Sequence, residues 1–242
     1  MSAAVPLEPW PPKSLSTVLI SASETILPSY ASTKISAPAP LVFSTLLDTS
    51  TYPEWNTWCP SVTVRSQPDA NSDNGSPTTA SSPGPQPSPV LQKDTHFTLH
   101  VIMDASKPSK TTDTHLRVTD ISIPTKQSDY VPVSLLQSPS FTQNLAKVYR
   151  VAWTVEGGFV ARGLRSERFH EVIVLGQEEC EVRTWECLGG ILARTVKWLY
   201  GRTLMEKFGL WVKDLKDFCE RRYEGGRVTE ESTVRAMVEG KK

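Results

Sequence analysis

A long amphipathic helix is predicted between Ile191 and about Arg221. Apolar residues recur there at alternating steps of four and three, the spacing of one helix face. The face comprises Val196, Tyr200, Leu204, Phe208, Trp211, Leu215 and Phe218. Gly201 should weaken or bend the helix near its middle. At about 1.5 Å per residue, such a helix can cross the whole face of a β-sheet.

The chain upstream of this helix alternates between apolar and polar residues, as half-buried strands do. About seven segments show the pattern: 30–38, 59–66, 96–103, 114–123, 146–155, 162–175 and 179–188. Short, glycine-containing connections between the later segments favour antiparallel hairpins. A short helix, which begins with a proline, is predicted at 40–48, after the first strand. The expected class is therefore α+β.

Three regions lie outside this regular pattern. We expect residues 1–28 to be an N-terminal extension, in which the apolar stretch 16–27 is either an extra strand or a helical turn. Residues 67–89 contain almost no large apolar side chains, and we predict a disordered insertion within one domain that spans 29–222. A second irregular segment follows at 124–144, and 223–242 should form a charged flexible tail.

Composition favours a small-molecule partner. Basic and acidic side chains number 26 each, so no net charge attracts nucleic acid or an anionic membrane. No apolar run approaches the roughly 20 residues that span a bilayer. The N-terminus lacks a basic segment followed by a long apolar stretch. We expect a cytoplasmic protein without stable membrane insertion, and the oligomeric state stays open.

Cysteine and histidine spacing indicates no metal site, and we expect no cofactor. The cysteines are scattered without a CxxC pair, which favours buried free thiols over a zinc site or a disulfide framework: Cys59, Cys180, Cys187 and Cys219. His96 and His100 would lie about 13 Å apart on a strand, too far to share a metal. Alternation places both on the face opposite Phe97 and Leu99.

The stretch YPEWNTW, residues 52–58, concentrates aromatic surface in a predicted turn. Pro53 disfavours a regular helix, and Asn56 can accept a hydrogen bond from its own backbone. Trp55 and Trp58 then offer large rigid surfaces to a ligand cavity. The alternative is that these rings only fill the core.

Several stretches resemble the START-like, or SRPBCC, superfamily, especially its polyketide cyclase/dehydrase and coenzyme Q-binding branches. The resemblance rests on ISAPAPLVFSTLLDTSTYPEWNTWCPSV, RFHEVIVLG, VRTWECLGG and WVKDLKDF. It implies a helix-grip fold, in which a curled antiparallel sheet surrounds the long helix and leaves a hydrophobic cavity. Relatives use such cavities to carry lipids, hold quinones or cyclise polyketides, and the fold does not choose among these uses.

Three residues are candidate catalytic groups within this resemblance. His170 would be the general base, Glu186 would orient it, and Arg168 would donate to a substrate oxygen. If the face of Glu186 lines the cavity, its pKa should rise, or it pairs with Arg168 or Arg162. The alternatives are an interior histidine without a catalytic role and a structural ion pair. None of the strong catalytic motifs for nucleophilic or metal hydrolysis occurs.

A set of aromatic and polar residues would bind the ligand: Trp55, Asn56, Trp58, Tyr149, Trp198, Phe208 and Trp211. Asn56 and Tyr149 would also donate to oxygen. The resulting hypothesis is an enzyme that promotes ring closure or dehydration of a polyketide-type substrate. The alternatives are a non-catalytic carrier of a lipid, quinone or other apolar molecule, and an interaction module that binds a partner through 67–89.

Overall fold

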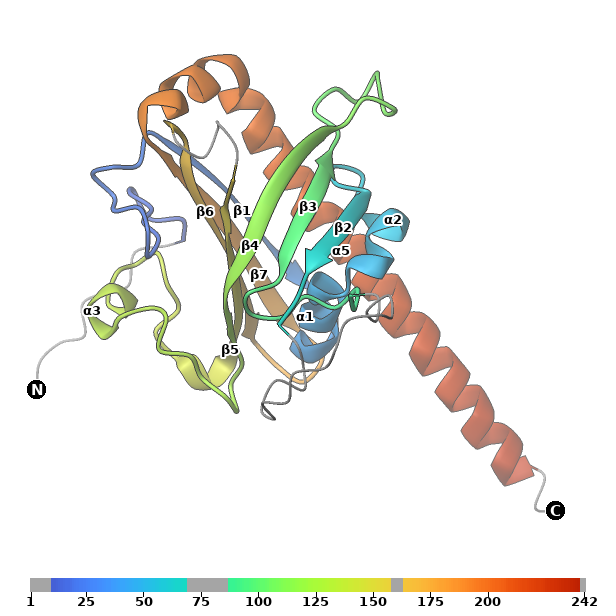
Figure 1. The fold of residues 1–242 in the computed structure, drawn as a ribbon. Helices are drawn as coiled ribbons and strands as arrows, with labels where there is room; N and C mark the ends of the chain where they lie inside the picture. The colour runs from blue at the N-terminus through green and yellow to red at the C-terminus, as the bar shows by residue number, and fades with distance from the viewer. Residues whose placement is uncertain (1–9, 69–86, 158–162, 240–242) are drawn as a thin grey trace, which may run out of the picture.

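A seven-stranded antiparallel sheet forms the body of the protein, with the strand order β1-β7-β6-β5-β4-β3-β2 (Figure 1). The computed structural model describes residues 10–68, 87–157 and 163–239, with side chains up to Gly226. The strands are β1 (Leu27–Ile35), β2 (Ser61–Ser66), β3 (His96–Val101), β4 (Thr112–Ser122), β5 (Val148–Val155), β6 (Arg165–Val174) and β7 (Cys180–Gly189). Every predicted strand segment is present, and every pairing is antiparallel.

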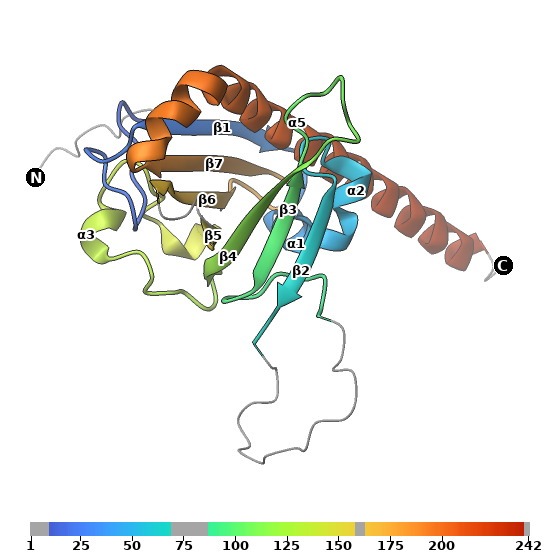
Figure 2. The ribbon, with the colours of Figure 1, turned by 45° about the horizontal axis from the view of Figure 1, so that its top comes forward.

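Helices α1, α2 and α5 lie along the inner side of the curled sheet, and the short helix α3 packs against its outer face (Figure 2). They are α1 (Ala39–Leu47), α2 (Tyr52–Trp55), α3 (Val133–Leu136) and α5 (Ile191–Glu239), with 3-10 turns η1 (Thr49–Thr51) and η2 (Leu145–Lys147). The long helix α5 packs mainly against the edge strand β1 and crosses the sheet toward α1 and α2. A curled antiparallel sheet packed around one long C-terminal helix is the helix-grip arrangement, so the predicted fold class is confirmed.

Gly190 makes the turn from β7 into α5 possible. Its φ is +89°, a backbone conformation that residues with a Cβ rarely adopt. An added Cβ would also lie 2.6 Å from the carbonyl oxygen of Gly163. The turn therefore needs glycine for both conformation and space, and it sets the direction in which α5 leaves the sheet.

The apolar stripe of α5 is buried in an aromatic core. Trp211 is fully buried, and its ring lies edge-on to Trp55 at 5.2 Å and to Tyr52 at 5.8 Å between centroids. Phe208 and Leu215 are also fully buried on the same stripe. The stripe predicted from the sequence is therefore the face that joins α5 to the sheet and to α2.

The outer face of the sheet is covered as well. Phe169 and Trp185 stack there with ring centroids 5.2 Å apart, and Phe141 packs edge-on against both. The N-terminal segment adds Leu15 and Ile20 to this cluster. Residues 10–26 and the irregular segment before β5 thus form a second layer on the sheet, with a hydrophobic cluster of its own.

Two buried glutamates of β6 fasten this second layer. Glu167 accepts hydrogen bonds from the Leu19 N–H at 2.8 Å and from the Tyr130 hydroxyl at 2.5 Å. Glu171 forms a buried ion pair with Arg150 at 2.6 Å and accepts from the N–H and hydroxyl of Thr142. The two glutamates on the outer face of β6 therefore bind segments for which the sequence showed no regular pattern.

Two details differ from the sequence-based expectations. Residues 52–55 form a helical turn, because Pro53 lies in its first turn, where a missing N–H costs nothing. α5 continues through Gly225 to Glu239, since the residues beyond include good helix formers. Of the two alternatives for the stretch 16–27, the structure has the helical turn, in which the Thr25 N–H donates to the Ser21 carbonyl before β1 begins. Most of the predicted insertion, 69–86, lies outside the described residues.

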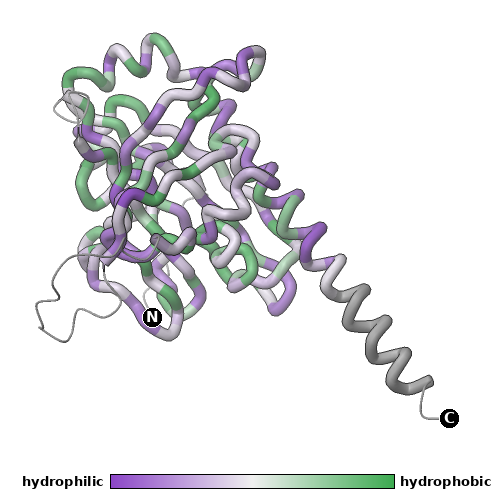
Figure 3. Tube along the Cα trace, turned by 45° about the vertical axis from the view of Figure 1, so that its right-hand side comes forward, coloured by the Kyte–Doolittle hydropathy of each residue, from purple (hydrophilic) through white to green (hydrophobic). Residues whose placement is uncertain are grey.

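Hydropathy alternates along the strands and along α5, as the green and purple stretches in Figure 3 show. Within the described ranges, no helix combines the length and the apolar character needed to cross a membrane.

Candidate functional site

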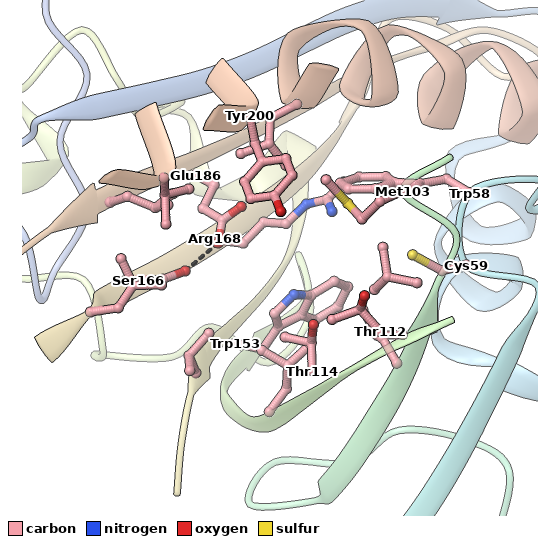
Figure 4. A pocket seen from close by; sticks show the side chains of 18 residues that line it. Trp58, Cys59, Met103, Thr112, Thr114, Trp153, Ser166, Arg168, Glu186 and Tyr200 are labelled. Atoms are coloured by element: carbon pink, nitrogen blue, oxygen red, sulfur yellow. Dashed lines mark hydrogen bonds between the residues drawn. The ribbon is translucent and has the colours of Figure 1, made fainter. Parts of the chain in front are cut away.

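A cavity of about 280 Å³ lies between the inner face of the sheet and the first half of α5 (Figure 4). Its volume is close to the lower end of small-molecule sites, about 300 Å³. Most of the wall is apolar and comes from β3, β4, β5, β7, α5 and the segments that connect strands and helices: Trp58, Leu99, Val101, Met103, Leu116, Trp153, Val155, Leu164, Leu188, Val196 and Leu204. The hydrophobic cavity implied by the resemblance is therefore present.

Three polar side chains of β6 and β7 interrupt the apolar wall. Arg168 is the register partner of Glu186, and Ser166 lies two residues before Arg168 on the same face. The Ser166 hydroxyl donates a hydrogen bond to Glu186 Oε1, drawn as the dashed line in Figure 4. The register between β6 and β7 runs without a bulge, so strict alternation aims all three side chains inward.

Arg168 is a buried cation held by aromatic rings. Its guanidinium carbon lies 4.1 Å from the ring centre of Phe208, 4.5 Å from Trp211 and 5.2 Å from Trp58. Nε donates to Thr184 Oγ1 at 3.2 Å. Burial lowers the pKa of Arg168 to about 10, so the side chain is charged at neutral pH. Cation–π contacts compensate part of the lost hydration.

Glu186 is half-buried and faces the cavity. Burial raises the pKa of its carboxyl above the usual 4.5, while Arg168 and the hydrogen bond from Ser166 oppose this shift. A raised pKa makes a carboxylate a stronger base than an ordinary glutamate, which is a useful property for a general base. The structure therefore places Glu186 as a half-buried carboxyl group beside Arg168, and Arg162, its other suggested partner, lies outside the described residues.

His170 does not line the cavity. It is fully buried on the inner face, with its ring 4.4 Å from Trp153 and 5.6 Å from Trp211 between centroids. Neither ring nitrogen has a hydrogen-bond partner among the described residues. Burial, helped by Arg168, lowers the pKa of His170 well below 6.5. The structure thus places a neutral, enclosed imidazole where the sequence suggested a base in contact with substrate.

The predicted ligand-binding residues divide into three groups. Trp58 lines the cavity. Four others are buried behind the cavity wall, so they support it without lining it: Trp55, Asn56, Phe208 and Trp211. As predicted, Asn56 accepts from a nearby backbone N–H, that of Cys59, at 2.8 Å.

Two predicted ligand-binding residues lie elsewhere. Tyr149 is on the inner face of β5 but packs against Phe43 at 5.3 Å, in a shallow pocket near α1. It lies outside the cavity because the cavity occupies only one end of the sheet. Trp198 is 83% exposed, since it points away from the buried stripe of α5. Neither residue lines the cavity.

Several lining residues escaped the sequence analysis, including Ser166, Trp153, Thr112 and Thr114. Trp153 was detectable, because it alternates with the inward-facing Val151 and Val155 on β5. Ser166 carried no such signal, since its importance depends on the strand register with β7.

In the described part of the chain, the cysteines and histidines form neither a disulfide nor a cluster that could bind a metal. All four cysteines are buried and free, as predicted, and burial raises the pKa of the Cys59 thiol to about 12. A thiolate is therefore scarce at this cavity-lining position. No cluster of three potential metal ligands occurs among the described residues.

Comparison with known proteins assigns a family. No known family model matches the chain. Oxopyrrolidines biosynthesis cluster protein O from Penicillium oxalicum is 33% identical over 218 residues, which cover 85% of this chain and 93% of the relative. The chain belongs to the same family as this cluster protein.

Solved structures are similar at the level of the fold. The hypothetical protein jhp0584 from Helicobacter pylori aligns over 81% of this chain and 89% of its own, with 13% identity and a TM-score of 0.54. A START superfamily protein from Mycobacterium smegmatis aligns over 82% of this chain and 98% of its own, with 14% identity and a TM-score of 0.45.

Proposed function

We propose that the protein is an enzyme of small-molecule biosynthesis that promotes ring closure or dehydration of a hydrophobic, carbonyl-containing substrate in its cavity. The observation that carries this proposal is the placement of Glu186 and Arg168 side by side in a mostly apolar wall. The relative from Penicillium oxalicum is named as a biosynthesis cluster protein, which supports a role in secondary metabolism.

The proposed chemistry divides proton transfer and charge stabilisation between these two residues. The Glu186 carboxylate removes an acidic proton from the carbon between two carbonyl groups, and Arg168 stabilises the enolate oxygen. The enolate carbon attacks a second carbonyl of the same molecule and closes the ring. Protonated Glu186 then returns its proton to the new alkoxide, which becomes the ring hydroxyl. In a dehydration, the Glu186 carboxylate removes the remaining proton from the neighbouring carbon and passes it to this hydroxyl, which leaves as water while the carbon–carbon double bond forms. His170 acts in this scheme as a neutral spacer behind the site.

A carrier of an apolar molecule is the second candidate. It is favoured by the apolar character of most of the cavity wall. A carrier needs the cavity but not proton transfer, so the two functions differ in their dependence on Glu186.

Replacement of Glu186 in the organism of origin separates them. A strain that carries Glu186→Gln should accumulate the uncyclised or hydrated precursor and lose at least 90% of the product, measured by liquid chromatography and mass spectrometry. A strain with Glu206→Gln, on the exposed face of α5, is the matched control and should retain the product. An unchanged product level in the Glu186→Gln strain, with the protein folded and present, would favour the carrier.

A further inference from the structure

Two buried arginines of neighbouring strands differ in how their charge is balanced. Arg150 on β5 donates from Nε and Nη2 to Glu171 Oε1, at 2.9 and 2.6 Å. Arg168 on β6 is buried to a similar degree, but no carboxylate of the described residues forms an ion pair with it, and its Nη2 has no hydrogen-bond partner there. A buried charge without an ion-pair partner is costly, so the environment of Arg168 is unusual.

None of the described titratable groups around Arg168 pairs with its positive charge. Tyr52, Cys59, Glu186 and His170 are the titratable groups in its electrostatic environment. Burial raises the pKa of Tyr52 and that of Cys59, so both are neutral at pH 7, and His170 carries no negative charge in either protonation state. Glu186 remains, and it is the register neighbour of Arg168, but its Oε1 accepts from Ser166 and it forms no ion pair with the guanidinium among the described residues.

We propose that Arg168 recognises an anionic oxygen of the ligand, so that the cavity selects small apolar molecules that end in a carboxylate or an acidic enol. Figure 4 shows the guanidinium among the lining side chains, between Tyr200, Met103 and Trp58. A guanidinium fork suits such oxygens and is charged at any physiological pH. This inference rests on the proposed function and names its substrate class.

The cavity limits the size of this ligand. A volume of about 280 Å³ accommodates a body of one or two fused rings, and the surrounding wall is apolar. 2-Naphthoate matches both the apolar body and the anionic end, and 2-naphthamide has nearly the same shape without the charge. Trp58 and Trp153 in the wall supply a fluorescence signal for binding.

Binding of the two compounds to the full chain tests the proposal. Tryptophan fluorescence titrations of the wild type should give at least a 10-fold lower Kd for 2-naphthoate than for 2-naphthamide. Arg168→Met should reduce this preference to less than threefold. Arg202→Met is the matched control, because Arg202 is 93% exposed on α5, and it should keep the wild-type preference.

The other outcomes overturn the inference in distinguishable ways. Equal affinity of the wild type for both compounds refutes anion selection and leaves the proposed ring-closing function standing; this comparison needs no variant to fold. Binding of neither compound contradicts both the inference and the ligand cavity on which the proposed function depends. A preserved preference in folded Arg168→Met, checked by circular dichroism, removes Arg168 from recognition.

Discussion

A histidine whose ring nitrogens have no partner is stable in a protein interior only while it is neutral. His170 satisfies this description, with its pKa well below 6.5. Below pH 6.5 the unfolded chain binds a proton that the folded chain does not, so the free energy of unfolding falls as the pH falls, by up to about 1.4 kcal/mol per pH unit.

His170→Leu should remove this dependence. We expect the variant to lie within about 1.5 kcal/mol of the wild type at pH 7, because Leu fits an apolar site of similar volume. Its stability relative to the wild type should increase between pH 6.5 and pH 4.5, measured by urea denaturation at each pH. A parallel pH dependence in both proteins would show that His170 is protonated in the folded state, contrary to its enclosed position.

Residue faces were predictable where the strands pair regularly. Alternation alone places Arg168 and His170 on one face of their strand, and the unbroken register of β6 and β7 puts Glu186 on that face as well. Contact with the cavity was not predictable for His170 or Tyr149, because alternation gives the face of a sheet but not the position of a void along it.

At the scale of elements, the direction of α5 depends on the single turn at Gly190. Gly190→Ala should destabilise the protein by about 2 kcal/mol or more, because alanine disfavours the positive φ and its Cβ meets the Gly163 carbonyl oxygen. Gly209→Ala, within α5, should stabilise it by about 0.5–1 kcal/mol, since its Cβ meets no atom within 4 Å and alanine favours a helix.

Thermal unfolding of both glycine variants checks this difference. The midpoint should fall for Gly190→Ala and rise for Gly209→Ala. Equal midpoints would mean that the turn tolerates a rearranged α5, and the geometry of the cavity would then not depend on Gly190.

The elements themselves were largely predictable from the sequence. The stripe of α5 and the alternation of the strands are local periodic signals, and both appear in the structure. The second layer on the sheet was not predictable, because residues 10–26 and the segment around Thr142 lack periodicity and are ordered by contacts with distant residues such as Glu167 and Glu171.

At the scale of the whole molecule, the sheet is covered on both faces. We therefore expect that loss of the outer layer destabilises the entire fold. Glu171→Gln leaves the charge of Arg150 buried without a counter-charge and weakens the attachment of Thr142. We expect a loss of about 3–5 kcal/mol in the free energy of unfolding, measured by urea denaturation. The control Glu181→Gln, in a partly exposed pair with Arg183, should cost less than about 1 kcal/mol.

The double variant Arg150→Met/Glu171→Leu tests the cause of this loss. It removes both charges together, so it should recover much of the stability that Glu171→Gln loses. A double variant as unstable as the single one would show that packing around the segment near Thr142, and not the unpaired charge of Arg150, determines the cost.

The central claim is that a small molecule binds between the sheet and α5. The protein has seven tryptophans, of which Trp58 and Trp153 line the cavity, Trp10 packs on the outer face and Trp198 is exposed. Fluorine NMR of the 5-fluorotryptophan-labelled protein, assigned by single Trp→Phe substitutions, reports on each position during a 2-naphthoate titration. The signals of Trp58 and Trp153 should shift while those of Trp10 and Trp198 stay in place. A shift confined to Trp10 or Trp198 would contradict the account.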